Sequence, residues 1–231
     1  MKKFILTFAA AAAIAMSVSA EYPAWLHLGR YAGENKALQA TQNNGDRVIF
    51  LGNSITEHWK IKHGEFFENH PNFVCRGISG ETTCQFLNRF REDVINNNPA
   101  VVIINGGTND IAENTGTYNA DFTFGNIVSM AQLAKANGIK VILTSVLPVE
   151  YYGWNLAITD APDKIKALNA RIKKYADEKG ITYVDYYEAM AMPNGAINPD
   201  YSQDGVHPVP AGYEVMESII VPVIEKELKK K

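Results

Sequence analysis

Short apolar runs alternate along this chain with longer segments in which apolar residues recur every three to four positions. The runs cover residues 47–51, 72–75, 100–104, 140–145 and 181–184, and glycine, proline or asparagine borders them. Their length and borders are typical of strands. A helix can begin over 55–60, a second is opened by Thr82-Thr83, and others are predicted over 122–137, 163–179 and 210–229. Continuous apolar strands that alternate with helices predict one parallel sheet with helices on both faces.

The first twenty residues have a different pattern. Met1-Lys2-Lys3 is basic, residues 4–16 are apolar and rich in alanine, and Val18-Ser19-Ala20 resembles a small-residue cleavage site. This layout is typical of a secretory signal peptide and is too short for a membrane span. We therefore expect residues 1–20 to be a signal peptide, cleavage near Ala20, and export to the periplasm or the outside of the cell.

The remaining residues, 21–231, suit a single α/β domain with a sizeable core. The whole chain has 22 basic and 25 acidic residues, and loss of Lys2 and Lys3 moves its formal net charge from -3 to -5. The mildly acidic balance argues against a nucleic-acid partner, and no other stretch is apolar enough for stable membrane insertion. Cys75 and Cys84 are the only cysteines. Export permits a disulfide, and two buried thiols are the alternative.

Four polar segments follow the predicted strands or the last core segment. They are Gly52-Asn53-Ser54, Gly77-Ile78-Ser79-Gly80, Gly106-Gly107-Thr108-Asn109-Asp110 and Asp204-Gly205-Val206-His207. Ligands of parallel sheets gather at the carboxyl ends of the strands, where three of these segments lie. Together they supply a serine, a histidine with a carboxylate three residues away, and several N–H donors. Acyl transfer by a serine requires that set of groups.

Ser54 is the candidate nucleophile, because it would lie in a tight turn at a helix N-terminus; a helix cap is the alternative role. His207 is the candidate base, with Asp204 to orient its ring. His58, one helical turn after Ser54, is the rival base, although a role in lining the pocket suits it better. Gly80 can offer an unobstructed backbone N–H, and Asn109 can offer its side-chain amide, to a developing oxyanion.

These four segments resemble the blocks of the SGNH hydrolases, the GDSL esterase/lipase superfamily, and their order covers nearly all of the chain after residue 20. The resemblance implies a three-layer α/β/α, flavodoxin-like fold with a parallel five-stranded sheet. It also implies a triad of Ser54, His207 and Asp204, and an oxyanion hole made by the Ser54 N–H, the Gly80 N–H and the Asn109 side chain. No metal or cofactor is implied. Asn53 departs from the family pattern, which usually has aspartate before the serine.

The compact length and the Thr82-Thr83 pair resemble the platelet-activating-factor acetylhydrolase-like and carbohydrate acetylesterase branches. We expect short connections without a lid, and a small-molecule or glycan ester substrate, most simply an O-acetyl group on carbohydrate. A lipid acyl hydrolase and a non-catalytic glycan-binding relic are the alternatives. Tyr151, Tyr152 and Trp154 either form an aromatic rim for a sugar ring or pack within their loop. The residues that we expect around the substrate are Asn53, His58, Thr108, Tyr151 and Trp154.

Overall fold

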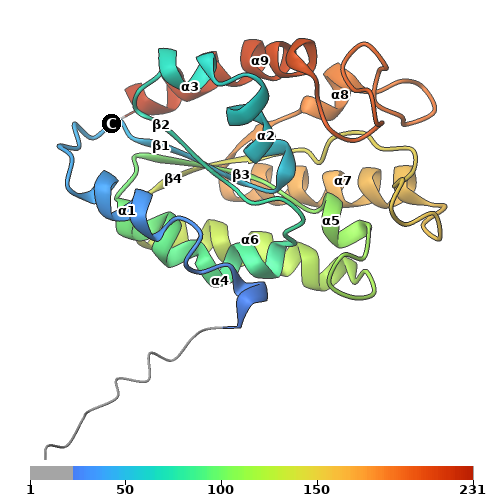
Figure 1. Ribbon diagram of the computed structural model, residues 1–231, viewed down its shortest axis with the longest axis horizontal. Coiled ribbons are helices and arrows are strands. Elements are labelled where there is room, and N and C mark those ends of the chain that lie inside the picture. Colours follow the sequence, from blue (N-terminus) through green and yellow to red (C-terminus); the bar gives the residue numbers. More distant parts are fainter. Residues whose placement is uncertain (1–22, 231) are drawn as a thin grey trace, which may run out of the picture.

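A five-stranded parallel sheet lies between two layers of helices in the computed structural model, which describes residues 23–230 (Figure 1). The strands are β1 (Val48–Gly52), β2 (Phe73–Gly77), β3 (Val101–Asn105), β4 (Lys140–Thr144) and β5 (Thr182–Val184). Their order in the sheet is β2-β1-β3-β4-β5, and each neighbouring pair is parallel. The predicted three-layer α/β/α architecture is therefore confirmed, with strand ends that differ from the prediction by one or two residues.

The longer helices lie where the apolar periodicity predicts them. They are α2 (Ser54–Lys62), α4 (Thr83–Asp93), α6 (Ala120–Ala136), α7 (Ala161–Lys179) and α9 (Pro210–Lys229). The sequence analysis did not predict α1 (Ala32–Gln39), α3 (Glu65–Asn69), α5 (Thr108–Ile111) and α8 (Tyr186–Met190), nor the 3₁₀ turns η1 (Ala24–Leu26) and η2 (Ile95–Asn97). Segments of three to eight residues contain too few turns to show a helical period.

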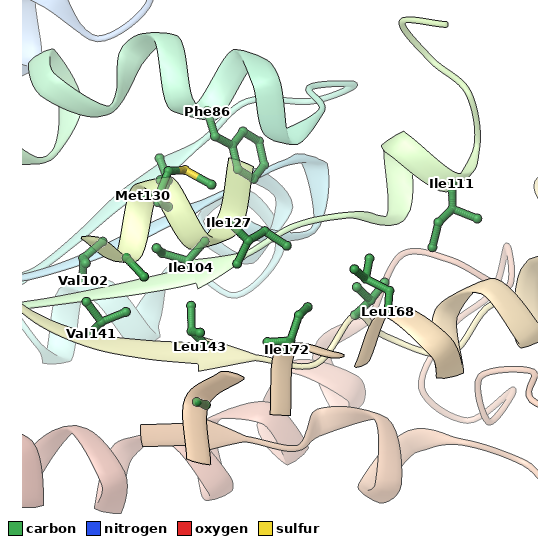
Figure 2. Close-up of a cluster of buried hydrophobic side chains, with 14 of the residues drawn as sticks. Phe86, Val102, Ile104, Ile111, Ile127, Met130, Val141, Leu143, Leu168 and Ile172 are labelled. Atoms are coloured by element: carbon green, nitrogen blue, oxygen red, sulfur yellow. The ribbon is translucent and has the colours of Figure 1, made fainter. Parts of the chain in front are cut away.

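The strands alternate their side chains between two separate cores. Ile49 and Leu51 of β1 pack in one core with α4, α6 and α7, part of which Figure 2 shows. Val48 and Phe50 point to the opposite face, into a core with α2, α3, α8 and α9. These last four helices lie above the sheet in the view of Figure 1, and α4 and α6 lie below it. Burial on both faces explains why the strands are continuously apolar.

The register of the sheet makes three strands end together. Gly52, the last residue of β1, pairs with Gly77 of β2 on one side and with Asn105 of β3 on the other. The loops that follow these strands carry Ser54, Gly80 and Asn109. Three of the predicted site segments therefore emerge from the same edge of the sheet, at the carboxyl ends of adjacent strands.

Two connections in the described part of the chain are long. Residues 145–160 join β4 to α7, and residues 191–209 join α8 to α9, and neither contains a regular helix or strand. The expectation of short connections is therefore wrong for these two segments, although the predicted elements themselves left residues 146–162 and 185–209 between them. Isolated bridges such as Tyr152–Asn155 and Ser202–Pro208 fold these two segments locally.

Three further expectations concern the signal peptide, membrane-spanning segments and the two cysteines. The predicted signal peptide lies outside the described residues. Within residues 23–230, no helix combines the length and the apolar character needed to cross a membrane. Cys75 and Cys84 are both free thiols; Cys75 is buried as expected, whereas Cys84 is only half-buried.

Candidate active site

Ser54 lies in the turn between β1 and α2, as the first residue of the helix. Asn53 caps α2, since its side-chain oxygen accepts a hydrogen bond from the N–H of Ile55 at 3.0 Å. The Ser54 hydroxyl is therefore free of the capping role that was the alternative, and its side chain lies at the positive end of the helix dipole. A glycine is needed just before the turn, because a Cβ on Gly52 would lie 2.0 Å from the Thr56 hydroxyl oxygen.

His207 is the histidine that contacts Ser54. Its Nε2 lies 2.9 Å from the Ser54 Oγ, and its Nδ1 lies 2.7 Å from Oδ2 of Asp204. A carboxylate can only accept here, so Nδ1 carries the proton and donates to Asp204, which leaves Nε2 to accept from Ser54. The three groups thus form a continuous hydrogen-bonded chain, from residues separated by 153 positions.

Asp204 is held by its own loop as well as by the imidazole. Its Oδ1 accepts the N–H groups of Val206 at 2.9 Å and His207 at 2.7 Å, and the hydroxyl of Ser202 at 3.2 Å. Partial burial raises the pKa of the Asp204 carboxyl, but the hydrogen bonds from His207 and Val206 outweigh it and hold this pKa well below its usual range. Asp204 is therefore ionised at neutral pH and can orient the His207 ring.

Gly80 and Asn109 supply two further N–H groups on the loops after β2 and β3, the strands that flank β1. Gly80 has a φ of 80°, which favours glycine, and its N–H has no acceptor among the hydrogen bonds of residues 23–230. The Asn109 side chain is 3% exposed, and its Nδ2 donates to the backbone carbonyl of Glu81 at 2.9 Å. That bond uses one of the two amide hydrogens and orients the other. The Ser54 N–H, at a helix start, is the third donor of this kind.

The residues expected around the substrate fall into two groups. Asn53 and Thr108 are 0% and 2% exposed, and the Thr108 hydroxyl pairs with the Tyr152 hydroxyl at 3.0 Å. These two side chains are buried, and so is Tyr152, which therefore does not form part of an exposed aromatic rim. A direct contact between substrate and Asn53 or Thr108 stays a prediction that this burial does not support.

His58 and Trp154, by contrast, flank His207. The ring centroids of His58 and Trp154 lie 5.1 and 6.3 Å from that of His207. Burial and the neighbouring His207 ring lower the pKa of His58, which favours its neutral form, and its buried Nδ1 has no hydrogen-bond partner. Trp154 is 50% exposed, and its indole N–H donates to the side-chain oxygen of Asn114 at 2.9 Å.

A cavity of about 330 Å³ lies beside the loop that carries Asp204. Its lining includes Tyr151 and Met192, which are 53% and 42% exposed, together with Ser202 and Gly205. Tyr151 thus lies at a cavity wall, with its ring open to solvent. No cluster of three His, Cys, Asp or Glu side chains suited to a metal ion occurs in the described part of the chain.

Glu57 is a residue near the site that the sequence analysis missed. It lies in the first turn of α2, and its Oε2 accepts the N–H of Ser79 at 2.9 Å and also the Ser79 hydroxyl. Burial raises the pKa of Glu57, yet the hydrogen bonds from Ser79 and Arg30 outweigh it and lower the pKa. An acid in the first turn of a helix is ordinarily a solvated charge that favours the helix dipole, so its position alone gave no signal.

The chain is similar in sequence and in fold to known proteins. The profile of the GDSL-like Lipase/Acylhydrolase family matches residues 50–215. A GDSL-like lipase from Bacteroides thetaiotaomicron VPI-5482 has 56% sequence identity and a TM-score of 0.85, over 87% of this chain and 98% of its own. A structure from Bacteroides fragilis NCTC 9343 also has 56% identity, with a TM-score of 0.86 over 89% of this chain and 99% of its own.

A more distant structure shares the fold alone. It is an acetylxylan esterase from Geobacillus stearothermophilus, with 20% identity and a TM-score of 0.59, over 81% of this chain and 95% of its own. A search among curated protein sequences gave no match.

Proposed function

Because the chain belongs to the GDSL-like lipase/acylhydrolase family, we propose that its esterase activity depends on a triad of Ser54, His207 and Asp204. The observation that carries this proposal is the continuous pair of contacts, 2.9 Å from Ser54 to His207 and 2.7 Å from His207 to Asp204. Hydrogen-bond reach from nucleophile to base, and from base to an orienting carboxylate, is the geometry that serine acyl transfer needs.

The reaction proceeds in two steps of acyl transfer. The Ser54 Oγ attacks the ester carbonyl carbon while His207 Nε2 takes its proton, and the carbonyl oxygen becomes an oxyanion. The C–O bond to the alcohol then breaks, and His207 returns the proton to the departing alcohol, which leaves an acyl group on Ser54. Water, deprotonated by His207, releases the carboxylic acid by the same sequence of steps.

Three donors stabilise the oxyanion in this proposal. They are the Ser54 N–H, the Gly80 N–H and the second hydrogen of the Asn109 amide, and each remains available in the geometry described above. The loss of one such donor typically lowers kcat about 10²–10³-fold. The donors act on charge that exists only in the transition state and in the tetrahedral intermediate, so they raise kcat more than they change substrate binding.

The test compares wild type with Ser54→Ala on p-nitrophenyl acetate. We expect Ser54→Ala to lower kcat by at least about 10⁴-fold, because the nucleophile is lost, with little change in melting temperature. Ser218→Ala, at an exposed serine of α9, is the matched control and should keep wild-type activity. A fluorophosphonate should label the Ser54 peptide in the wild type. A Ser54→Ala protein that keeps its activity would overturn the mechanism.

We further propose that the substrate is an acetyl ester on a carbohydrate. Support comes from Trp154, whose half-exposed ring lies beside His207, and from Tyr151, whose exposed ring lines the neighbouring cavity. Exposed aromatic faces of this kind provide flat apolar surfaces for the C–H faces of sugar rings. The measurement is release of acetate from acetylated xylan, pectin or sialic acid.

A lipid acyl hydrolase is the second candidate, and one observation favours it. Leu156 and Met192, on the two long connections, are 69% and 42% exposed, so apolar side chains are available for an acyl chain. Faster hydrolysis of octanoyl and longer esters, with no acetate released from any glycan, would decide for this second candidate.

A further inference from the structure

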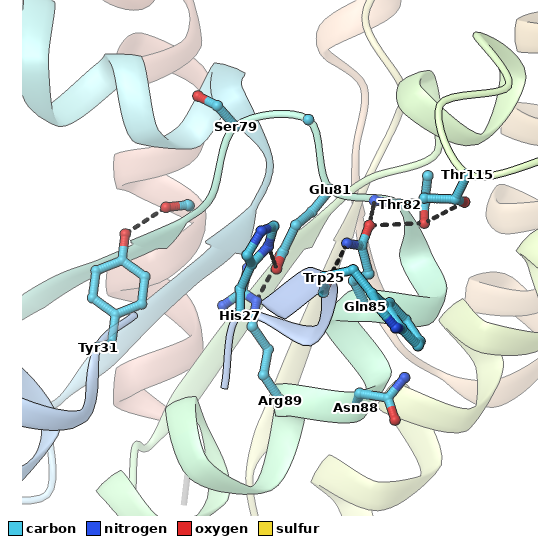
Figure 3. A network of polar contacts seen from close by, with 12 residues as sticks. Trp25, His27, Tyr31, Ser79, Glu81, Thr82, Gln85, Asn88, Arg89 and Thr115 are labelled. Carbon is cyan, nitrogen blue, oxygen red and sulfur yellow. Dashed lines mark hydrogen bonds and ion pairs between the residues drawn. The ribbon is translucent and has the colours of Figure 1, made fainter. Parts of the chain in front are cut away.

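The loop that carries Gly80 is held by a buried ion pair behind the proposed oxyanion site. Glu81 follows Gly80 directly, and its side chain is 0% exposed. Its carboxylate accepts Nε of Arg89 at 2.7 Å and contacts Nδ1 of His27 at 3.0 Å. Figure 3 shows Glu81 between these two partners, which come from α4 and from the segment after η1.

Arg89 connects this ion pair to the ends of two strands. Its side chain is completely buried, and its Nη2 donates to the backbone carbonyl of Gly52 at 3.0 Å and to that of Arg76 at 2.9 Å. Gly52 ends β1 two residues before Ser54, and Arg76 lies in β2 four residues before Gly80. The planar guanidinium therefore fixes the nucleophile strand, its neighbour and the Glu81 carboxylate relative to one another.

The backbone of Glu81 completes the connection to the second donor. Its carbonyl accepts the Nδ2 of Asn109 at 2.9 Å, which determines where the remaining amide hydrogen points. Glu81 is thus bonded covalently to Gly80, by a hydrogen bond to Asn109, and by an ion pair to Arg89. One residue joins both of the loop donors to the strand that precedes Ser54.

We propose that Glu81 and Arg89 are positioning residues that hold the Gly80 N–H and the Asn109 amide toward the oxyanion. The proposal rests on the esterase function proposed above. A buried ion pair is weak evidence for stability, because desolvation offsets much of the attraction between the charges. This pair is also connected to two proposed oxyanion donors and to the strand before Ser54. We therefore expect its loss to lower the catalytic rate, because a misplacement of about 1 Å can cost about 10²-fold in rate.

Asp93 provides a matched control within the same cluster. Its carboxylate is the second buried acidic partner of Arg89. Its Oδ2 lies 2.9 Å from Nη1 of Arg89, and its side chain is 3% exposed. Asp93 lies on α4, four residues after Arg89, and its side chain makes no contact with the Gly80 loop among the hydrogen bonds of the described residues. Loss of its charge should therefore remove one of the two carboxylate partners of Arg89 and leave the contact between Glu81 and Arg89 in place.

The experiment compares Glu81→Gln with Asp93→Asn in the full chain. Both substitutions keep the shape of the side chain and remove one negative charge. Glu81→Gln should lower kcat for p-nitrophenyl acetate about 10- to 100-fold with KM unchanged, because the donors act in the transition state. Both variants should have melting temperatures lowered by similar amounts. Asp93→Asn should nevertheless keep kcat within about threefold of wild type. Equal losses of kcat in the two variants would overturn the proposal.

A double-mutant cycle with Asn109→Ala identifies the route of the effect. If Glu81 acts through the donors, Glu81→Gln should reduce kcat much less in the Asn109→Ala background than in the wild type. A purely structural role for Glu81 predicts the same factor in both backgrounds, and that result would contradict positioning.

Hydrogen exchange tests the same proposal without any activity. Glu81→Gln should speed exchange of backbone amides over residues 78–83 and 106–112, whereas Asp93→Asn should not. A wild-type protein that fails to hydrolyse p-nitrophenyl acetate would contradict the proposed function, and the exchange comparison would still decide whether Glu81 holds the loop. Equal exchange over these two segments in both variants would show that it does not.

Discussion

Single contacts distinguish the two histidines that lie near Ser54. His207 contacts both the serine and Asp204, whereas the buried Nδ1 of His58 has no partner to orient its ring. A base needs its second nitrogen held, so that the correct tautomer faces the nucleophile. This requirement favours His207 over the rival that the sequence left open.

Replacement of each histidine by alanine separates their roles. His207→Ala should lower kcat by several orders of magnitude, because proton transfer is lost. His58→Ala should change mainly KM or the range of esters accepted, because its ring packs against His207 at the site without a bond to Ser54. Steady-state kinetics on p-nitrophenyl acetate measures both. The opposite pattern would move the base to His58.

Asp204 gives a pH dependence whose sign can be worked out. Its pKa in the folded protein is well below its usual value, so its ionised form stabilises the fold at pH values above the unfolded pKa of about 4, and this contribution is lost as the pH falls toward the folded pKa. Asp204→Asn should therefore lower the melting temperature by about 2–4 °C at pH 7, the shift expected for a loss of about 1 kcal/mol from a carboxylate that is 56% exposed and screened by water.

The same difference between wild type and Asp204→Asn should shrink at pH 3, where the wild-type carboxyl loses part of this contribution. Thermal unfolding followed by circular dichroism at both pH values makes the measurement. A difference that is constant between pH 3 and pH 7 would contradict the role given to the hydrogen bonds on Asp204.

At the scale of elements, close packing of α2 on β2 determines where the turn that carries Ser54 lies. A Cβ on Gly77 would lie 2.2 Å from the backbone N of Glu57 and 2.7 Å from the carbonyl oxygen of Asn53. Backbone atoms cannot move aside as a flexible side chain can. Gly77 therefore permits the helix that begins at Ser54 to lie directly on the end of β2.

Gly77→Ala should destabilise the protein by at least about 1–3 kcal/mol and lower kcat as well, because α2 must shift together with Ser54. Gly125→Ala is the control, since Gly125 lies inside α6 with nothing within 4 Å of an added Cβ. That change should stabilise the fold by up to about 1 kcal/mol, as expected for a helical glycine replaced by alanine, with activity unchanged. Urea unfolding and kinetics on the same samples test both. A Gly77→Ala protein of wild-type stability would be inconsistent with this packing.

The sequence predicted elements well where the apolar pattern was long enough to define them. The five strands and five longer helices could be located, and α9 begins and ends at the predicted residues, Pro210 and Lys229. The buried position of Arg89 was not predicted, although Arg89 and Asp93 lie on the same helical face as Phe86 and Phe90. A charged pair four residues apart on an otherwise apolar face was the available signal, but a sequence does not say which buried carbonyls and carboxylates will surround it.

At the scale of the whole molecule, contacts distant in sequence bring the two halves of the site together. The Tyr213 hydroxyl on α9 donates to the backbone carbonyl of Ile55 at 2.8 Å. Ile55 follows Ser54 directly, and Tyr213 lies six residues after His207. This fully buried bond joins α9, which follows the proposed base His207, to α2, which begins at the proposed nucleophile Ser54. The loop over residues 191–209 is therefore anchored at its α9 end, close to the position where His207 must meet Ser54.

The same arrangement sets the size of the acyl group that the site should accept. Ser54 is 7% exposed and Asn109 is 3% exposed, so the proposed reacting centre is largely shielded from solvent. An acetyl group needs little space beyond the three proposed oxyanion donors, whereas a long acyl chain needs an apolar groove that leads away from Ser54. The exposed Trp154 ring next to His207 is suited to the alcohol side of the ester. We therefore expect kcat/KM to fall steadily along a series of p-nitrophenyl esters from acetyl to palmitoyl.

Trp154→Ala should raise KM for an acetylated oligosaccharide more than for p-nitrophenyl acetate, because only the larger alcohol reaches the ring. A rise in kcat/KM toward octanoyl, with Trp154→Ala impairing long esters most, would assign this ring to an acyl chain instead.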